Sequence, residues 1–91
     1  MRSELAEASV RKWLKVVRFD IPCLTSVPKT AVYENYKTWC AENNVFIYTL
    51  VPFATALLKI VPNLGHTHPR MNGNRVRCYI FPPTDDFDDL L

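Results

Sequence analysis

Apolar residues recur at helical spacing in three separate stretches of the chain. The first stretch holds a stripe of five such residues, namely Leu5, Val10, Trp13, Leu14 and Val17. The basic residues of the same segment fall outside this stripe, which is typical of a helix with one buried face. The pattern therefore predicts an amphipathic helix near the start of the chain.

The second helical stretch begins at Pro28, because proline is tolerated in the first turn of a helix, and it ends at Asn43-Asn44. Its apolar positions follow at helical spacing: Val32, Tyr36, Trp39 and Cys40, with Tyr33 beside them. Aromatic residues in such a pattern either pack in a core or form a platform on which bases stack. The helical spacing favours the core.

The third stretch runs from Thr49 to Pro62 and predicts a short helix. Thr49 can accept a hydrogen bond from the first free backbone N–H groups, and Pro52 stands in the opening turn. The apolar positions near helical spacing are Phe53, Leu57, Leu58 and Val61. Pro62 then ends the helix.

A β-hairpin is predicted from His66 to Phe81. Asn72-Gly73 is the strongest short-range signal for a two-residue hairpin turn, because both turn positions require a positive φ. Since side chains alternate between the two faces of a strand, Arg75 and Arg77 share the outer face of the return strand. The other face holds Val76, Cys78 and Ile80.

The remaining segments complete the predicted order. Residues 19–27 contain Pro22 and few helix formers, so they predict a connection, which can hold a short strand at Cys23–Thr25 that pairs with the hairpin. Residues 45–48 are either a strand-like linker or the lead-in to the third helix. The order is then three helices and a hairpin with a small antiparallel sheet. This is the α+β order of a winged helix, and it makes nucleic acid the first partner to consider.

The charge of the chain is unevenly distributed. The net charge is only +2, but residues 83–91 hold four aspartates and no basic residue. The residues before them therefore carry eleven basic and five acidic side chains, a net +6. We predict one small domain over residues 1–82 and an acidic, flexible tail over residues 83–91. The basic domain suits phosphates or another anionic surface, although the same charges can simply keep a protein soluble.

Catalytic and metal-binding arrangements are not found in the sequence. The aspartates gather in the tail, where no rigid scaffold positions them. Cys23, Cys40 and Cys78 have no paired spacing, and with His66 and His68 they match no recognised zinc spacing. No signal segment and no apolar run of about 18 residues occurs. We therefore expect a binding module without enzymatic activity, cofactor, metal, small-molecule substrate or membrane span, in an intracellular, reducing compartment with buried thiols at Cys40 and Cys78.

Several short motifs resemble the RFX-type winged-helix DNA-binding domain. In order along the chain they are Trp13-Leu14, Ser26-Val27-Pro28-Lys29, Val32-Tyr33, Tyr36 and Trp39-Cys40. The second half continues without gaps at Phe53, Pro62-Asn63-Leu64, Gly73 and Tyr79. The resemblance covers residues 10–82.

This resemblance implies a winged helix that binds double-stranded DNA, regulates transcription and works in the nucleus. In RFX-type domains the hairpin, called the wing, supplies much of the reading of the major groove. The third helix of the family lies toward the minor groove. Lys29 matches a basic residue at the start of the family's second helix.

Most of the family's charged DNA contacts are nevertheless absent at their own positions. Thr55 and Leu58 replace a lysine and an arginine in the third helix. In the wing, four positions that are basic amino acids in the family hold other residues here: Thr67, His68, Asn72 and Val76. Basic residues stand close by instead, at Lys59, Arg70, Arg75 and Arg77. Either these residues make the contacts in a shifted register, or the fold is kept and the contacts are lost.

The predicted DNA-binding residues are Arg70, Arg75, Arg77, Lys59, Thr55, His68, Asn72, Lys29 and Lys37. The arginines of the hairpin suit phosphates and guanine edges alike, because the guanidinium group donates in a planar fork. The lysines of the second helix would contact the DNA backbone.

Two alternatives remain open. Leu57 and Leu58, where the family is basic, and the acidic tail suggest a protein-interaction module on a winged-helix scaffold. The segment Tyr33–Cys40 also resembles the second helix of the C-terminal winged-helix domain in poxvirus- and phage-type primase-helicases. That likeness implies a DNA-engaging part of a replication enzyme, although the turn Pro62-Asn63-Leu64 favours the RFX type.

Overall fold

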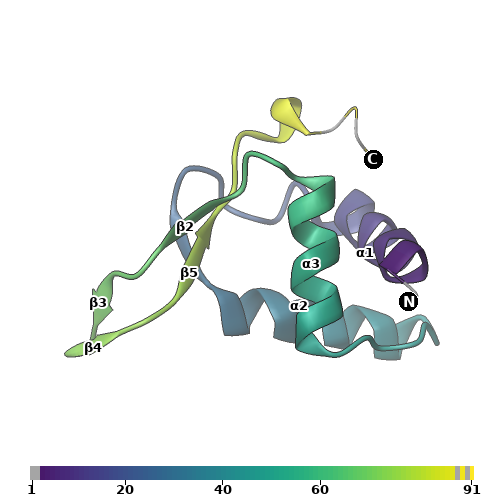
Figure 1. Ribbon diagram of the computed structural model, residues 1–91, viewed down its shortest axis with the longest axis horizontal. Coiled ribbons are helices and arrows are strands. Elements are labelled where there is room, and N and C mark those ends of the chain that lie inside the picture. Colours follow the sequence, from purple (N-terminus) through teal and green to yellow (C-terminus); the bar gives the residue numbers. More distant parts are fainter. Residues whose placement is uncertain (1–2, 88, 90) are drawn as a thin grey trace.

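Three helices pack together, and a two-stranded hairpin extends from them (Figure 1). The computed structural model describes residues 3–87, 89 and 91. Its helices are α1 (Ser3–Val17), α2 (Lys29–Glu42), α3 (Leu50–Ile60) and a short 3-10 helix, η1 (Thr84–Asp86). Its strands are β1 (Ser26–Pro28), β2 (Gly65–Thr67), β3 (Arg70–Met71), β4 (Asn74–Arg75) and β5 (Cys78–Ile80). The expected α+β class, with three helices and a small antiparallel sheet, is confirmed.

The buried face of α1 differs from the predicted stripe at one position. Its core residues are Ala6, Val10, Trp13, Leu14 and Val17. Leu5 was expected among them but is 57% exposed. Because successive helical residues are about 100° apart, Ala6 at the start of the buried face turns Leu5 away from it.

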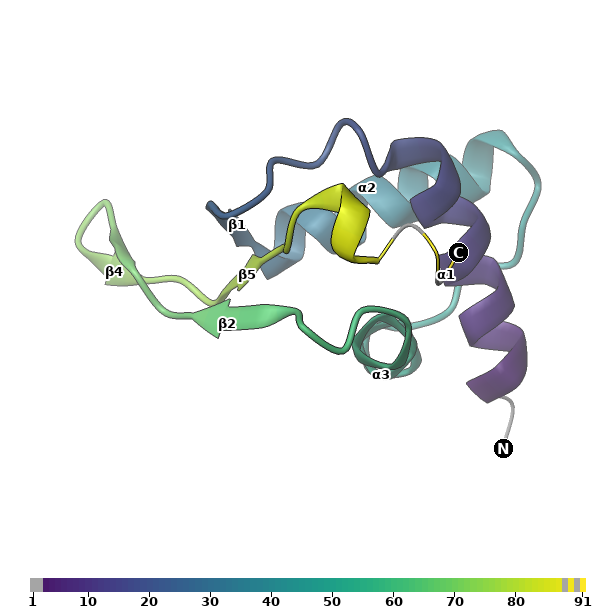
Figure 2. The ribbon, with the colours of Figure 1, turned by 90° about the horizontal axis from the view of Figure 1, so that it is seen from above.

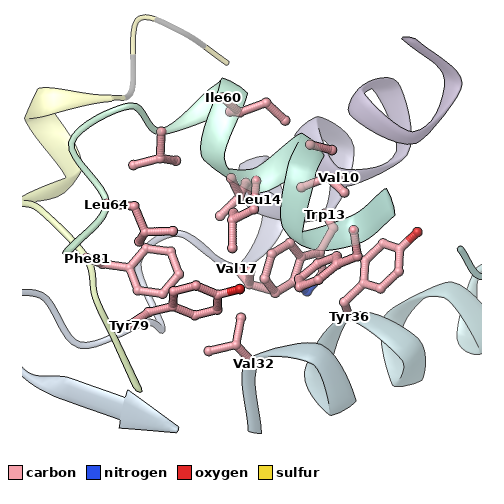
Figure 3. Close-up of a cluster of buried hydrophobic side chains, with 14 of the residues drawn as sticks. Val10, Trp13, Leu14, Val17, Val32, Tyr36, Ile60, Leu64, Tyr79 and Phe81 are labelled. Carbon is pink, nitrogen blue, oxygen red and sulfur yellow. The ribbon is translucent and has the colours of Figure 1, made fainter. Parts of the chain in front are cut away.

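The centre of the core is an aromatic cluster drawn from all three helices. Figure 3 shows two of its members, Trp13 and Tyr36. The ring of Phe53 lies 4.6 Å from that of Tyr36 and 5.6 Å from that of Trp13, measured between centroids. Tyr33 and Trp39 are partly buried against the same cluster. The prediction that these aromatic residues belong to the core is confirmed, and Cys40 and Cys78 are buried thiols as expected.

The start and end of α3 follow the sequence signals. Thr49 is the N-cap in an extended conformation, and its carbonyl accepts a hydrogen bond of 3.1 Å from the N–H of Phe53. The expected bond from its side chain is not formed. The helix ends before Pro62, as predicted.

Within the described part of the chain, no helix has the length and apolar character needed to cross a bilayer.

The hairpin and the first connection form a sheet of three strands in the order β1-β5-β2, and both pairings are antiparallel. The predicted strand at Cys23–Thr25 lies three residues later, at Ser26–Pro28. Leu24 has a φ of 58°, which interrupts an extended run, so continuous pairing begins only after it. Cys23 makes a single parallel bridge with Phe81.

One register runs along the whole hairpin. Gly65 pairs with Ile80 at its base, and Arg70 pairs with Arg75 near its tip. Asn72 and Gly73 have φ values of 51° and 82°, which confirms the predicted tight turn. Pro69 lacks an N–H group and therefore interrupts the ladder between β2 and β3.

Of the predicted tail, residues 83–87, 89 and 91 are described, and part of this segment packs on the domain instead of leaving it at residue 82. The η1 turn follows Pro83, and Phe87 is only 3% exposed within the core cluster. Leu91 packs partly against the same cluster. The predicted boundary is therefore too early, because an apolar side chain in the acidic segment contributes to the core.

Candidate nucleic-acid interface

One face of the hairpin gathers basic side chains. Arg70 and Arg75 are direct cross-strand partners, and the same register continued across Pro69 sets His68 opposite Arg77. The N–H of Val76 donates to the carbonyl of Pro69 at 3.0 Å, which holds the two strands together there. Because cross-strand partners project to the same side of a sheet, these four side chains share one face.

Two residues of this face, Arg75 and Arg77, are exposed and lie beside α3. By strand alternation both arginines share the face of Tyr79, which is buried in the core. They line a groove of about 600 Å³ between the hairpin and α3. The residues that line the groove are Lys29, Thr30, Leu50, Val51, Ala54, Thr55, Leu58, Arg75, Val76, Arg77 and Tyr79.

Lys29 is fixed where the hairpin meets α2. Its backbone N–H donates a hydrogen bond of 2.9 Å to the carbonyl of Arg77, which continues the pairing of β1 with β5. Its ammonium nitrogen lies 4.9 Å from the centre of the Tyr79 ring, within cation–π range. The first residue of α2 thus presents a positive charge beside those of the hairpin.

The groove carries positive charge without a compensating acid. Three of its lining residues are basic and none is acidic. Like charges directly opposite each other on paired strands, as at Arg70 and Arg75, are destabilising. An anion placed between these side chains would remove that repulsion. The surface is therefore complementary to a negatively charged partner.

His66 lies at the base of the same face, where its ring packs edge-on against Tyr79 with centroids 5.7 Å apart. Desolvation in this position lowers the pKa of His66 below its usual value, and the positive charge of Lys29 and the neighbouring His68 lower it further. A nearby phosphate would act in the opposite direction, because it would favour the protonated imidazole.

The other predicted site residues are distributed over several surfaces. Thr55 lines the groove, and Asn72 occupies the tip of the hairpin. Lys59 lies 3.4 Å from the carboxylate of Glu7 on α1 and does not line the groove. Lys37 pairs with Glu34 at 2.9 Å, and this hydrogen bond raises the pKa of Lys37. The structure thus gathers part of the predicted set and leaves Lys59 and Lys37 in ion pairs elsewhere.

The side of α3 that lines the groove is mostly apolar, which goes beyond the Leu57-Leu58 pair noted in the sequence. Leu50, Val51, Ala54 and Leu58 line the groove. Leu57 was expected to meet a protein partner together with Leu58, but it is fully buried, so only Leu58 is available at the surface. A signal was present, because α3 is apolar almost all round, whereas a helix with one solvated face normally carries polar residues there.

Comparison with known proteins adds no relative, since no family model, curated protein or solved structure matches the chain. The surface itself therefore carries the functional inference.

Proposed function

We propose that this chain is a winged-helix module that binds double-stranded DNA through the basic face of its hairpin. The observation that carries the proposal is the set of four side chains on that face: Arg70, Arg75, His68 and Arg77. Lys29 extends the positive charge from the hairpin to the start of α2. The hairpin reaches out from the three helices, so its tip can approach a duplex without obstruction (Figure 2).

The shape of the hairpin suits this role. The major groove of DNA admits a two-stranded β-ribbon. With the hairpin in the major groove, the arginines at its tip would contact phosphates or the edge of a guanine. Lys29 would contact the DNA backbone. The phosphate contacts would supply affinity, and only contacts to base edges would supply sequence preference.

In this arrangement α3 contributes fewer DNA contacts than the sequence suggested. On its groove side, Thr55 offers the only polar side chain of α3, and Lys59 is paired with Glu7. The hairpin would therefore make most of the contacts. This division agrees with the resemblance to RFX-type domains, in which the wing does much of the reading.

A fluorescence anisotropy titration against labelled duplexes at two salt concentrations tests the proposal. We expect Arg75→Ala combined with Arg77→Ala to weaken binding and to flatten the slope of log affinity against log salt by about two, close to one per lost phosphate contact. The matched control is Lys12→Ala with Lys15→Ala, which removes two exposed charges from α1. Unchanged binding in the hairpin variant, or an equal loss in the control, would falsify the assignment.

The same titration separates the two DNA-binding alternatives. Preference for an RFX-site duplex over a random one would support a transcription regulator that acts in the nucleus. Equally tight, salt-dependent binding to both duplexes would support the primase-helicase type. An absence of binding at low salt would mean that the basic face serves another anionic partner.

A further inference from the structure

The groove between α3 and the hairpin has two parts with different chemistry. Five of its lining residues are apolar and are called the floor here: Leu50, Val51, Ala54, Leu58 and Val76. Three are basic and are called the rim: Lys29, Arg75 and Arg77. DNA binding by the hairpin accounts for the rim but leaves the floor unexplained.

The floor is unusually exposed for its composition. The exposed fractions are 74% for Val51, 50% for Leu50 and 41% for Leu58. Phe46 and Ile47, in the segment between α2 and α3, are also exposed but do not line the groove. A contiguous exposed apolar surface with polar surroundings marks a site of interaction on a protein that is otherwise normally packed.

We propose that this groove binds an acidic amphipathic helix from a partner protein. The groove has a volume of about 600 Å³. A helix of the partner would place apolar residues one turn apart against Val51 and Leu58, as in helix-in-groove recognition. Its flanking aspartates or glutamates would then meet Lys29, Arg75 and Arg77.

Charge complementarity selects an acidic partner, and the floor selects a peptide over a nucleic acid. No acidic residue lines the groove, so a basic or neutral helix would leave its three cations without an acidic partner. A duplex, in contrast, would have to set some of its phosphates against the apolar side chains of Val51 and Leu58, which donate no hydrogen bond. Loss of water from a charged group without replacement hydrogen bonds is unfavourable.

The acidic end of a second copy of the chain fits the groove less well. Its composition is suitable, because Phe87 lies among aspartates. However, Phe87 is buried in the core of its own domain, so it would have to be withdrawn before it could bind elsewhere. This occupant is therefore kept as an outcome of the test.

The test uses a fluorescent 16-residue probe peptide with leucines one turn apart on one face and glutamates on the other. A scrambled peptide of the same composition has the same charge but no apolar face. We expect the probe to bind, and Val51→Gln combined with Leu58→Gln to weaken it at least about tenfold, the effect expected of central contacts. Val16→Gln, at a residue of α1 that is 60% exposed, is the control and should leave the affinity within about twofold. Circular dichroism melts would establish that each variant folds.

Three results would overturn the proposal. Equal binding of the scrambled peptide would show that only charge is recognised. A loss of duplex affinity in the Val51→Gln and Leu58→Gln variant as large as its loss of peptide affinity would assign the floor to DNA. A concentration-dependent dimer in sedimentation that this variant abolishes would identify a second copy as the occupant. Because duplex binding is measured separately, failure of the peptide proposal is distinguishable from failure of DNA binding.

Discussion

The hydroxyl groups of Ser9 on α1 and Tyr36 on α2 lie 3.0 Å apart in a buried hydrogen bond between residues 27 positions apart in sequence. The same phenolic oxygen accepts a weaker bond of 3.4 Å from the N–H of Tyr48, just before α3. Desolvation raises the pKa of Tyr36, so the phenol stays neutral and can serve in this network. One side chain thus links the first helix to the segment that leads into the third.

We predict that Tyr36→Phe destabilises the domain by about 1–3 kcal/mol, because the buried hydroxyl of Ser9 and the N–H of Tyr48 both lose a partner. Ser9→Ala should cost less, since Tyr36 keeps its bond to Tyr48. The double variant should cost less than the sum of the two single changes. Urea unfolding of the four proteins measures this, and strict additivity would show that the bond contributes nothing.

The turn of the hairpin gives a second prediction. Gly73 has a φ of 82° with open space around it, so Gly73→Ala introduces backbone strain of about 1–2 kcal/mol without a steric clash. The strain is local, and it should loosen β3 and β4 without unfolding the helices. Amide exchange at Val76, whose N–H is bonded to Pro69, should become faster, whereas exchange within α1 should not change. Equal protection of Val76 in both proteins would contradict this expectation.

A third prediction concerns the pH dependence of stability. The pKa of His66 in the folded protein lies below its ordinary value of about 6.5 because of desolvation, with Lys29 and His68 contributing. As the pH falls, the unfolded chain binds the proton on His66 before the folded protein does. The free energy of unfolding therefore decreases. The decrease from His66 ends below its folded pKa, where both states are protonated. His66→Gln should therefore lose less stability than the parent between pH 7.5 and the folded pKa.

An NMR titration of the His66 ring measures the pKa of His66 in the folded protein directly. The midpoint of the free protein should lie below that of a histidine in an unstructured peptide. If a duplex binds along the hairpin face, its phosphates should raise the pKa of His66. A midpoint that does not move on saturation with DNA would place the phosphates away from this end of the face.

The local signals in the sequence were sufficient for much of the fold. Pro28 and Pro62 mark helix boundaries to within one or two residues, and Asn72-Gly73 sets the turn, because each of these residues restricts its own backbone. The first strand was placed three residues too early, since its position depends on pairing with a segment at least 50 residues away. Leu5 was misplaced because a stripe of apolar residues leaves the rotation of the helix uncertain by about one residue.

The candidate site was predictable only in part. Strand alternation predicts that Arg75 and Arg77 share one side, and both line the groove. It does not predict the groove itself, because that depends on the attachment of the hairpin to the core through Tyr79. Lys59 was grouped with the hairpin residues because it lies on the third helix. Its partner Glu7 is 52 positions earlier, and no local pattern reveals such a contact.

The end of the chain gives a fourth prediction. Phe87 is buried in the core cluster, so Phe87→Ala should destabilise the domain by about 3 kcal/mol through lost burial and a residual cavity. Asp89→Ala, at an exposed position two residues later, should change stability by less than about 0.5 kcal/mol. Thermal unfolding of both variants provides the measurement. Equal melting temperatures would show that residues 83–91 act as the separate tail that the sequence suggested.

The ion pair between Lys59 and Glu7 gives a fifth prediction, which divides the predicted DNA-binding residues into two groups. The ion pair connects α3 to α1, and the side chain of Lys59 is 54% exposed. Lys59→Ala should therefore lower the free energy of unfolding by at most about 1 kcal/mol, as is usual for a surface ion pair. Because it does not line the groove, its removal should leave the salt slope of duplex binding unchanged. Arg75→Ala, which removes the same charge from the hairpin face, should reduce that slope by about one.

Glu7→Gln completes this comparison, because it frees the ammonium group of Lys59 without removing it. If DNA contacts only the hairpin, Glu7→Gln should bind duplexes with the salt slope of the parent. If α3 also lies against DNA, Glu7→Gln should bind more tightly and Lys59→Ala more weakly than the parent. Anisotropy measurements on these three variants therefore determine whether α3 contributes to the DNA-binding surface or is free to bind the acidic helix.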